Sequence, residues 1–428
     1  MEHKRVVISG IGMVTSHGIG KEQVFSSIVK GTNRIQPIPD SFSGYYQFKS
    51  RFYVPFPEFT LSTYGIASKY GKRMQDEDRT ALLCALLAIK DAGFPVEKRD
   101  TRFAVKELSH SGILLGTGFS GLQTAFHSYC AHVCKEKAVH QYSRIVIPLM
   151  MPNSVSAWVS IFFHIKGGAV TMNASCASGT TAIGRAFRLI QNGHYTSILA
   201  GGVECLKEST GAIMRGFDVL GALTKSADGS PRPFSKQRSG FLFSEGGGCI
   251  IVLEELEHAL KRGAPVYAEV VDYRENSDAY SIIQIDPDPV QIIQLLHDLK
   301  GERNIDYINT HGTATISNDS AEAKAITSVF GKKEEQPIIS ATKGILGHTI
   351  GASGAIETAI TALSINRNII HASGVEDPLD INLAQHTMNK GITFALSVSY
   401  GFGGHNAGIV LKKFHHSKEV KGRRIDNG

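Results

Sequence analysis

The sequence predicts an α/β fold in which a buried, largely parallel sheet carries helices on both faces. Short β-branched runs alternate with helical patterns along the chain, and this alternation is typical of parallel sheets. Glycine is abundant, with 44 of 428 residues, as expected for a backbone that turns sharply or approaches itself closely. The predicted strands are VVIS (6–9), ILL (113–115), SILA (197–200), YIN (307–309) and TFALSVS (393–399).

Helical patterns fill the stretches between these strands. The predicted helices span 66–92, 147–163, 177–192 and 349–366. The third ends at Asn192-Gly193, and glycine is common just after a helix.

Two pairs of segments echo one another. Ala177-Ser178-Gly179 and Ala352-Ser353-Gly354 each open an alanine-rich helix, and GGGCIIVLEE (246–255) resembles GGHNAGIVLKK (403–413). The echo suggests a duplicated unit divided near residue 260, although two short matches can also arise by chance. We therefore expect an N-terminal half over 1–260, a C-terminal half over 261–414 and a basic, disordered tail over 415–428.

Composition narrows the possible functions. The net charge of +6 is only mildly basic for 428 residues, which argues against general nucleic-acid binding but permits a local patch for an acidic partner. No apolar run reaches membrane-spanning length, and the N-terminal segment has no secretory hydrophobic region. The six cysteines lack disulfide-framework spacing, so we expect a reducing, cytoplasmic environment.

One cysteine lies at a predicted strand-to-helix corner. In VTMNASCASGTTAIG (170–184), Cys176 directly precedes a helix, where unpaired backbone N–H groups favour thiolate over thiol. Such a cysteine can act as a nucleophile. A buried cysteine that only packs is the alternative, and this segment alone does not exclude it.

Two further segments carry residues capable of acid–base chemistry. INTHGTAT (308–315) places His311 after a buried strand, and SATKGILGHTIGASGAIE (340–357) contains Lys343 and His348 before a helix. A histidine at a strand end is often structural, so each segment is ambiguous by itself.

Taken together, these segments resemble the elongating β-ketoacyl carrier-protein synthases and the related ketosynthase subunits of type II polyketide or polyene synthases. The resemblance runs through RVVISGIGMVTSHG (5–18), the cysteine corner, PFSKQRSGFLFSEGGG (233–248), NTHGTATISNDSAE (309–322) and SYGFGGHNA (399–407). It implies a thiolase-like fold, a duplicated five-layer α-β-α-β-α arrangement with two mixed sheets.

The resemblance also implies a reaction, the decarboxylative Claisen condensation of an acyl chain with malonyl-carrier protein. Cys176 matches the nucleophile that holds the acyl chain, and His311 and His348 match the pair that supports decarboxylation and condensation. Lys343 matches the lysine that orders the site, with Glu322 as its expected ionic partner.

Other matched positions have supporting roles. The family places an oxyanion hole at the backbone N–H groups matching Cys176 and Phe402, in GFGG. Thr313 and Thr315 match positions that hydrogen-bond the pantetheine arm, although isolated threonines are usually turn residues. Asp319 and Glu357 match acidic supporting positions, for which a purely structural role is an equal alternative.

The resemblance implies an acidic carrier protein as partner, a dimer, and no cofactor or metal of the chain's own, because phosphopantetheine arrives on the carrier. Lys69, Lys72 and Arg73 in SKYGKRM (68–74) match the carrier-docking helix, where their spacing would place them on one face, and Lys225 is a further candidate. The following Asp76, Glu77 and Asp78 dilute this charge, so a solvated surface is the alternative.

Phe119 lies in GTGFSG (116–121) and matches a position lining the far end of the acyl tunnel. A phenyl ring there predicts short or medium acyl chains, or a tunnel that opens across a partner subunit. GTGFSG also has the GxGxxG form of a dehydrogenase. We regard this only as a remote alternative, because the polar stretch CAHVCKEKAVHQ (130–141) follows where a second strand would be needed.

Several departures leave the substrate open. Tyr400 and Ser239 stand where the family usually has Phe and Asp, and Ser281 begins a shortened connection. A fatty-acid enzyme and a polyketide or polyene synthase therefore both remain possible, as homodimer or as heterodimer with a chain-length partner. A degradative thiolase would need a cysteine beyond Cys249, and a non-catalytic partner would lack the cysteine at position 176. FHSYCAHVC (126–134) lacks structural zinc spacing and is expected to pack.

Overall fold

The computed structural model describes residues 3–44, 46–134 and 144–415. Its centre consists of ten strands in two sets of five. The N-terminal set runs in the order β1 (Val6–Thr15), β10 (Gly246–Glu255), β9 (Ser197–Cys205), β7 (Gly112–Gly116) and β8 (Ala169–Met172). The C-terminal set runs β11 (Ala268–Ser277), β17 (His405–Lys412), β16 (Phe394–Gly401), β12 (Tyr307–Asn309) and β13 (Ile338–Ser340).

The two sets have the same topology. In each, the first two neighbouring pairs are antiparallel and the last two are parallel. In each, the sheet order also corresponds to the first, fifth, fourth, second and third strand along the chain. The duplicated fold with mixed strand pairing is therefore confirmed, and the echoed segments 246–255 and 403–413 are the equivalent strands β10 and β17. The expectation of a largely parallel sheet is wrong, because half of the pairs within each set are antiparallel.

The two sets also join edge to edge. Val6, Val7 and Ile8 of β1 pair with Val270, Glu269 and Ala268 of β11, so hydrogen bonding continues from one set into the other. With β2 (Gly18–Ile19) beside β1, the whole forms an eleven-stranded sheet. Three short ribbons lie outside it: β3 (Gln36–Pro37) with β4 (Phe52–Tyr53), β5 (Glu97–Arg99) with β6 (Arg102–Ala104), and β14 (Ile369–Ile370) with β15 (Met388–Asn389).

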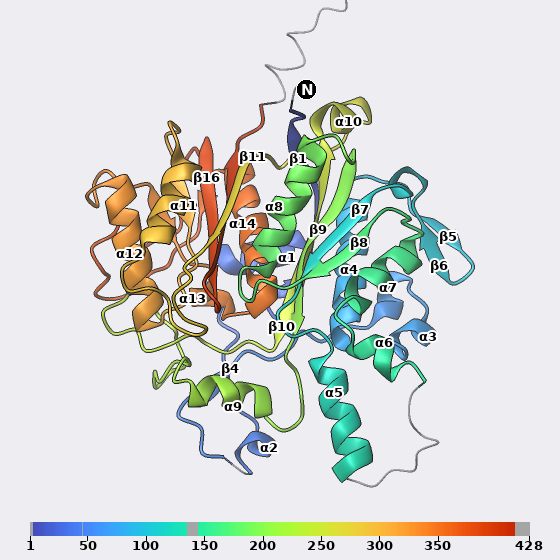
Figure 1. Ribbon diagram of the computed structural model, residues 1–428, viewed down its shortest axis with the longest axis horizontal. Coiled ribbons are helices and arrows are strands. Elements are labelled where there is room, and N and C mark those ends of the chain that lie inside the picture. The colour runs from blue at the N-terminus through green and yellow to red at the C-terminus, as the bar shows by residue number, and fades with distance from the viewer. Residues whose placement is uncertain (1–2, 45, 135–143, 416–428) are drawn as a thin grey trace, which may run out of the picture.

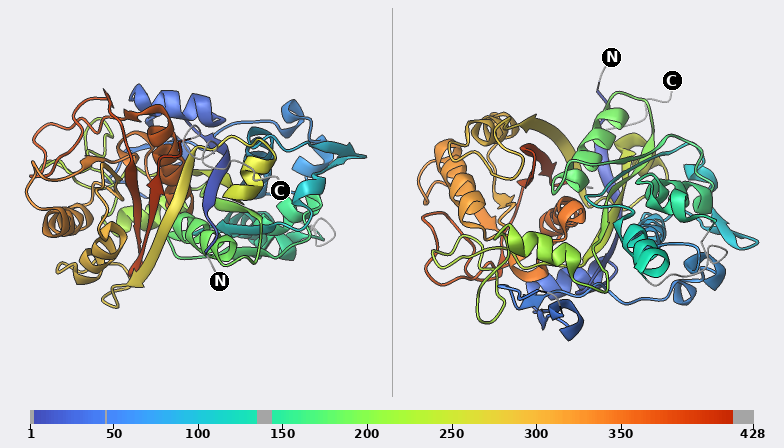
Figure 2. Two further views of the ribbon diagram at one scale, coloured as in Figure 1. Left: turned by 90° about the horizontal axis from the view of Figure 1, so that it is seen from above. Right: turned by 60° about the horizontal axis from the view of Figure 1, so that its bottom comes forward.

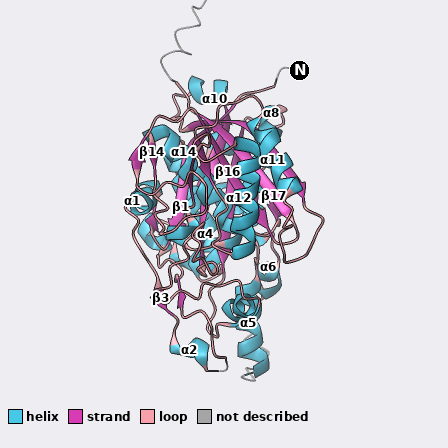
Figure 3. Cartoon of the chain, turned by 90° about the vertical axis from the view of Figure 1, so that its left-hand side faces the viewer, coloured by secondary structure: helices cyan, strands magenta, loops and turns pink. Residues whose placement is uncertain are grey.

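Helices form three layers around these strands (Figures 1 and 2). α8 (Ser178–Gln191) and α14 (Ser353–Arg367) contact strands of both sets and fill the middle. α4 (Asp76–Asp91) and α7 (Ser154–Phe163) cover the N-terminal set, whereas α11 (Val290–Lys300) and α12 (Ile316–Phe330) lie on the side of the C-terminal set (Figure 3). The five-layer arrangement is confirmed.

The remaining helices are short and lie around this core. They are α1 (Lys21–Val29), α2 (Asp40–Ser43), α3 (Ser68–Gly71), α5 (Leu122–Tyr129), α6 (Val146–Met150), α9 (Ala212–Val219), α10 (Leu256–Lys261) and α13 (Lys343–Leu346). The expected boundary at residue 260 falls within α10, and residues 416–428 of the predicted tail lie outside the described residues.

The central helices approach closely at their first turns, which are the two Ala-Ser-Gly segments. A Cβ atom on Gly179 would lie 2.7 Å from Ala355 N, and one on Gly354 would lie 2.0 Å from Thr180 Oγ1. Side chains at these positions would force the helices apart. The echoed glycines therefore permit the contact that brings the starts of α8 and α14 together.

Three predicted helices begin or break differently. The helix predicted over 66–92 is divided into α3 and α4, because Gln75 and Asp78 form a capping box that starts α4. The helix over 147–163 is divided into α6 and α7 around Pro152, and the one over 349–366 begins with a 3₁₀ turn at Ile350–Ala352. The helix over 177–192 is confirmed as α8.

Candidate active site

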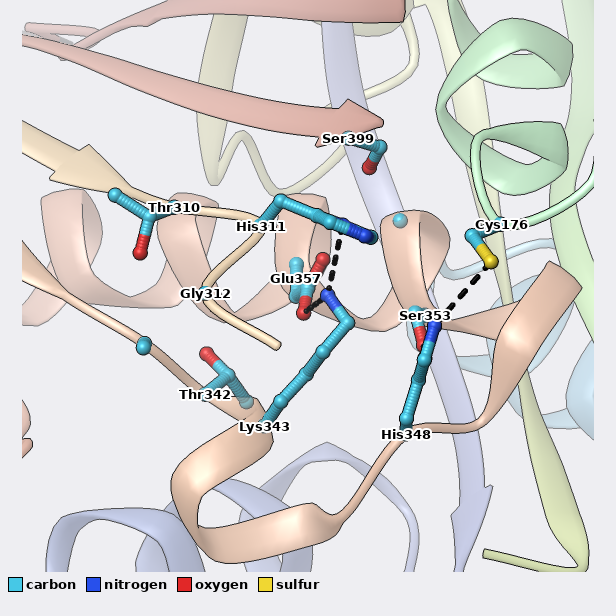
Figure 4. Close-up of polar contacts among 12 residues, drawn as sticks. Cys176, Thr310, His311, Gly312, Thr342, Lys343, His348, Ser353, Glu357 and Ser399 are labelled. Carbon is cyan, nitrogen blue, oxygen red and sulfur yellow. Dashed lines mark hydrogen bonds and ion pairs between the residues drawn. The ribbon is translucent and has the colours of Figure 1, made fainter. Parts of the chain in front are cut away.

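Three of the four predicted catalytic side chains meet in one cavity. It has a volume of about 480 Å³, and Cys176, His311 and His348 all border it. Cys176 comes from the N-terminal half, at the start of α8, whereas both histidines come from loops of the C-terminal half (Figure 4). The chemistry therefore lies between the duplicated units.

Cys176 is held at a sharp backbone corner. Ser175 has a φ of +53°, and its carbonyl accepts a hydrogen bond of 2.6 Å from Ser178 Oγ. This turn directs Cys176 Sγ to within 3.2 Å of His348 Nε2. The expectation that the helix start favours thiolate is wrong for the resting site, because burial raises the pKa of Cys176 to about 11 despite Ser175, Lys343 and the Phe402 N–H, which lower it.

The partners of His348 define its tautomer. Its Nδ1 accepts a 3.2 Å hydrogen bond from the backbone N–H of Ile350, and Ser353 Oγ lies 3.0 Å from the same atom. Burial, followed by the charge of Lys343, lowers the pKa of His348 well below its usual value. His348 is therefore a neutral imidazole whose Nε2–H points at Cys176 Sγ.

His311 is held in the same tautomer by Lys343. The Lys343 ammonium donates to His311 Nδ1 at 3.2 Å, which leaves the proton of the neutral ring on Nε2. Burial, with Lys343 and His348, lowers the pKa of His311 well below its usual value. The two imidazole rings lie 5.5 Å apart, nearly perpendicular, and both offer an N–H donor.

The prediction that Lys343 pairs with Glu322 is wrong. Lys343 Nζ pairs with Glu357 Oε1 at 2.5 Å, because α14 carries Glu357 past the lysine in the central layer (Figure 4). Glu322 instead accepts the backbone N–H groups of His311 at 2.8 Å and Gly312 at 2.9 Å. Glu322 therefore fixes the backbone of the loop that carries the His311 side chain.

The three predicted supporting carboxylates, Glu322, Asp319 and Glu357, are fully buried. Burial raises the pKa of Glu357 to about 7 and that of Glu322 to about 8, although hydrogen bonds or Lys343 oppose the shift. Asp319 accepts the backbone N–H groups of Phe234 at 2.6 Å and Ala314 at 3.1 Å, and burial raises its pKa to about 6. Glu357 thus contacts the catalytic lysine directly, whereas Asp319 supports loops.

The predicted oxyanion and pantetheine residues border the same cavity. Phe402, directly after β16, has its backbone N–H at the Cys176 thiol. Thr313 Oγ1 and Thr315 Oγ1 lie 3.0 Å apart, and Thr315 also accepts from Asn318 N as the N-cap of α12. Lys225 lies on the cavity wall, where its backbone N–H donates to Ser239 Oγ at 3.0 Å.

The predicted docking cations do not share a helix face. α3 ends at Gly71, because its four residues close only one turn before the chain leads to the cap of α4. Lys72 and Arg73 instead border a separate cavity of about 630 Å³ together with Arg144. Its other walls include Leu149, Trp158 and Ile161, so cations surround an apolar floor.

Phe119 lies behind the cavity and does not border it within the described residues. Its ring meets Phe217 edge to face at 6.1 Å, and Phe217 borders the cavity. Phe119 thus contacts one residue of the cavity wall, and its own side chain is 38% exposed.

Sequence reasoning missed Glu204, whose carboxylate accepts the Phe119 N–H at 3.0 Å. A glutamate inside the apolar run SILAGGVEC (197–205) was the available signal, because buried charges need partners.

Tyr400, which stands where the family usually has Phe, adds a hydroxyl group beside the site. It is 5% exposed, its ring lies 5.7 Å from that of His311, and its hydroxyl has no hydrogen-bond partner in the described part of the chain.

Within residues 3–44, 46–134 and 144–415, no group of His, Cys, Asp and Glu could hold a metal ion. Among the described helices, none is long and apolar enough to cross a membrane.

Curated relatives match almost the whole chain. A 3-oxoacyl-[acyl-carrier-protein] synthase 2 of Staphylococcus aureus is 32% identical over 96% of this chain and 99% of its own length. The protein of the same name from Synechocystis is 34% identical over 97% and 99%. Among solved structures, a β-ketoacyl synthase from Burkholderia phymatum has a TM-score of 0.85 at 28% identity, covering 96% of this chain and all of its own.

Another solved structure shows the likeness of the fold. A type II polyketide ketosynthase in complex with its acyl-carrier protein has a TM-score of 0.84 at 23% identity, covering 96% of this chain and all of its own. The family models for the N-terminal and C-terminal domains of β-ketoacyl synthase match residues 3–259 and 267–374. The chain therefore belongs to the β-ketoacyl synthase family.

Proposed function

We propose that the chain catalyses the decarboxylative Claisen condensation of an acyl group on Cys176 with malonyl-acyl carrier protein, giving β-ketoacyl-acyl carrier protein. One observation carries this proposal. Two neutral imidazoles, each with its proton on Nε2, border the cavity that contains the cysteine. Such a site can stabilise an enolate without a metal.

In the first step, Cys176 takes the acyl group from its carrier thioester. The sulfur attacks the carbonyl carbon, the carrier thiol leaves, and the thiol proton of Cys176 passes to the departing sulfur. Because burial keeps the resting thiol protonated, the His348 Nε2–H at 3.2 Å stabilises the sulfur as negative charge develops on it.

In the second step, the malonyl thioester loses carbon dioxide. The electrons of the breaking C–C bond pass to the thioester oxygen, and the Nε2–H groups of His311 and His348 donate to the resulting enolate. The Lys343 ammonium keeps His311 oriented as a donor. Neutral donors suit this step, because they stabilise the enolate without protonating its carbon.

In the third step, the enolate carbon attacks the acyl carbonyl on Cys176. This attack forms the new C–C bond, and the backbone N–H groups of Cys176 and Phe402 are proposed to hold the resulting oxyanion. Its collapse restores the carbonyl, breaks the C–S bond and releases Cys176 as a thiolate, which takes a proton from water. One such donor contributes about a hundred- to a thousandfold in rate. Thr313 and Thr315 would meet the pantetheine arm, so phosphopantetheine comes with the carrier and the chain supplies no cofactor.

The carrier protein is proposed to dock on the cavity bordered by Lys72, Arg73 and Arg144. An acidic partner with an apolar contact fits cations around an apolar floor, and Lys69 and Lys225 are exposed cations that would extend the contact. A polyketide ketosynthase among the structural neighbours is described in complex with its acyl-carrier protein, which supports a carrier as partner.

A dimer is proposed through β8. This strand is at the edge of the sheet, and Val170 on it is 50% exposed, so it offers free backbone groups and apolar surface to a second chain. The partner is a second copy or a related chain-length subunit, and sedimentation of the chain alone distinguishes the two. We propose the cytoplasm as its compartment, because the described cysteines are free thiols.

The proposal is tested by product analysis. The purified chain, an acyl-carrier protein and malonyl-carrier protein should give carbon dioxide and a β-ketoacyl product two carbons longer. His311→Ala and His348→Ala should each abolish product, because both histidines act on the enolate. Cys176 should still be acylated at the wild-type rate in His311→Ala and more slowly in His348→Ala, because the His348 Nε2–H also stabilises the sulfur. Product formation at the wild-type rate by both variants would contradict the proposed roles.

A further inference from the structure

Glu204, at the end of β9, joins two loops behind the active site. It is fully buried, and its Oε2 accepts the backbone N–H groups of Gly118 at 2.8 Å and Gly351 at 2.9 Å. Its Oε1 accepts the Phe119 N–H at 3.0 Å. Gly118 and Phe119 follow β7, whereas Gly351 follows His348 in the loop before α14. One carboxylate therefore fixes both loops.

Both loops need glycine to reach this carboxylate. A Cβ atom on Gly118 would lie 2.6 Å from Glu204 Oε2, and one on Gly351 would lie 2.4 Å from Gly118 N. Neither distance leaves room for a methyl group. The glycine in the middle of GTGFSG thus has a packing role at this carboxylate.

The residue directly before Gly351 has a strained backbone. Ile350 has a φ of +46°, which is unfavourable for a β-branched side chain and persists only where the surroundings impose it. The next peptide N–H, that of Gly351, is the one bound by Glu204. In this conformation the Ile350 N–H reaches His348 Nδ1 at 3.2 Å.

We infer that Glu204 is a positioning residue that holds the left-handed Ile350 turn and thereby keeps His348 as the Nε2–H donor. With Nδ1 occupied by the Ile350 N–H, the ring proton remains on Nε2, which faces Cys176 Sγ at 3.2 Å. This role rests on the proposed function, in which that N–H stabilises the enolate. Without the carboxylate, Ile350 relaxes and Nδ1 loses its backbone N–H donor, which leaves only the Ser353 hydroxyl, a group that can donate or accept.

The charge on Glu204 suits three backbone donors. Its buried neighbour Glu77 accepts the Thr117 hydroxyl at 2.5 Å, and burial raises the pKa of both carboxyls. Backbone N–H groups favour the ionised form, and Glu204 has three of them. Within this pair, the three backbone donors favour the negative charge on Glu204 over Glu77.

The test is a double-mutant cycle of Glu204→Leu and Ile350→Gly. Glu204→Leu should lower kcat of condensation about ten- to a hundredfold with little change in KM, because the histidine is displaced while carrier docking is untouched. Nitrogen-15 NMR of the imidazoles should show His348 losing its single Nε2–H tautomer. In the Ile350→Gly background, where a positive φ costs little, Glu204→Leu should cost much less.

Glu245→Leu is the matched control, because Glu245 is also buried but accepts the Phe56 N–H at 2.8 Å rather than a backbone N–H of Gly118, Phe119 or Gly351. It should keep the wild-type tautomer and kcat. If Glu204→Leu does not fold, Gly118→Ala displaces the same contact while leaving the carboxylate in place.

An unchanged kcat and tautomer in the Glu204 variant, or an equal loss in both Ile350 backgrounds, would overturn the role. The tautomer is measured without turnover. A wild-type chain that makes no product would therefore contradict the proposed function and leave this inference to be judged by NMR.

Discussion

At the residue scale, the buried Lys343 ammonium connects the acid–base groups of the site. It donates to His311 Nδ1 and pairs with Glu357 Oε1, and both side chains of the pair are only 2% exposed. A buried pair contributes little net stability while intact, but removing one partner leaves the other charge without compensation.

Lys343→Met should therefore destabilise the fold by about 3 kcal/mol, and the double variant Lys343→Met, Glu357→Leu should recover much of that loss. Urea unfolding measures both. The exposed pair of Lys324 with Asp288 provides the control, since Lys324→Met should change stability little. A double variant no more stable than Lys343→Met would contradict the pairing of Lys343 with Glu357.

Another buried histidine predicts a pH dependence of stability. His17 is 3% exposed, its Nε2 lies 3.0 Å from the Thr32 carbonyl, and burial lowers its pKa from 6.5 to about 4. A depressed histidine pKa stabilises the fold above the unfolded value of 6.5, and this stability is lost as pH falls toward 4.

His17→Leu should therefore lose less stability than the wild type between pH 6.5 and pH 4, by up to about 3 kcal/mol. Urea unfolding across this range measures the difference. His297→Leu is the control, because the His297 side chain is 74% exposed. Parallel pH profiles for the wild type and His17→Leu would refute the assignment.

At the element scale, the break between α3 and α4 determines where the docking cations lie. The capping box at Gln75 starts α4, so Lys72 and Arg73 lie on the connecting turn and border the apolar cavity with Arg144. The motif SKYGKRM allowed the cations to be identified. It did not reveal the helix break or Arg144, because both depend on packing between segments far apart in the chain.

Lys72→Glu with Arg73→Glu should raise KM for carrier-bound substrate at least about tenfold while kcat changes little, because rim charges steer association. Steady-state kinetics at low salt measure this, and the effect should shrink as salt rises. Lys261→Glu, on α10, is the matched charge reversal away from this cavity. An equal rise in KM for both variants would count against a specific docking site.

The loop between β7 and α5 carries the residue expected to limit chain length. Phe119 packs edge to face on Phe217, which borders the catalytic cavity. Phe119→Ala should therefore shift the fastest Cys176 acylation toward longer chains, as measured over an acyl-length series. Tyr129→Ala, an exposed aromatic on α5, should leave the profile unchanged. Fastest turnover of the wild type with long saturated chains would refute the short-chain preference.

At the scale of the whole molecule, duplication explains the location of the site. The starts of α8 and α14 meet through Gly179 and Gly354, and this contact brings Cys176 of one half to His348 of the other. The duplication and the catalytic motifs were predictable, because the sequence signals for both lie in short continuous segments. Three features were not predictable: the pairing of Lys343 with Glu357 rather than Glu322, the role of Glu204 and the raised pKa of Cys176. They arise from burial and from contacts between segments that are distant in the chain.

Mass spectrometry of Cys176 tests the central claim most directly. The chain is incubated with a panel of acyl-carrier proteins, digested and mapped. We predict an acyl adduct on the peptide containing Cys176, its loss on addition of malonyl-carrier protein, and no adduct in Cys176→Ala. No adduct from any donor, or one that persists in Cys176→Ala, would contradict the proposed mechanism.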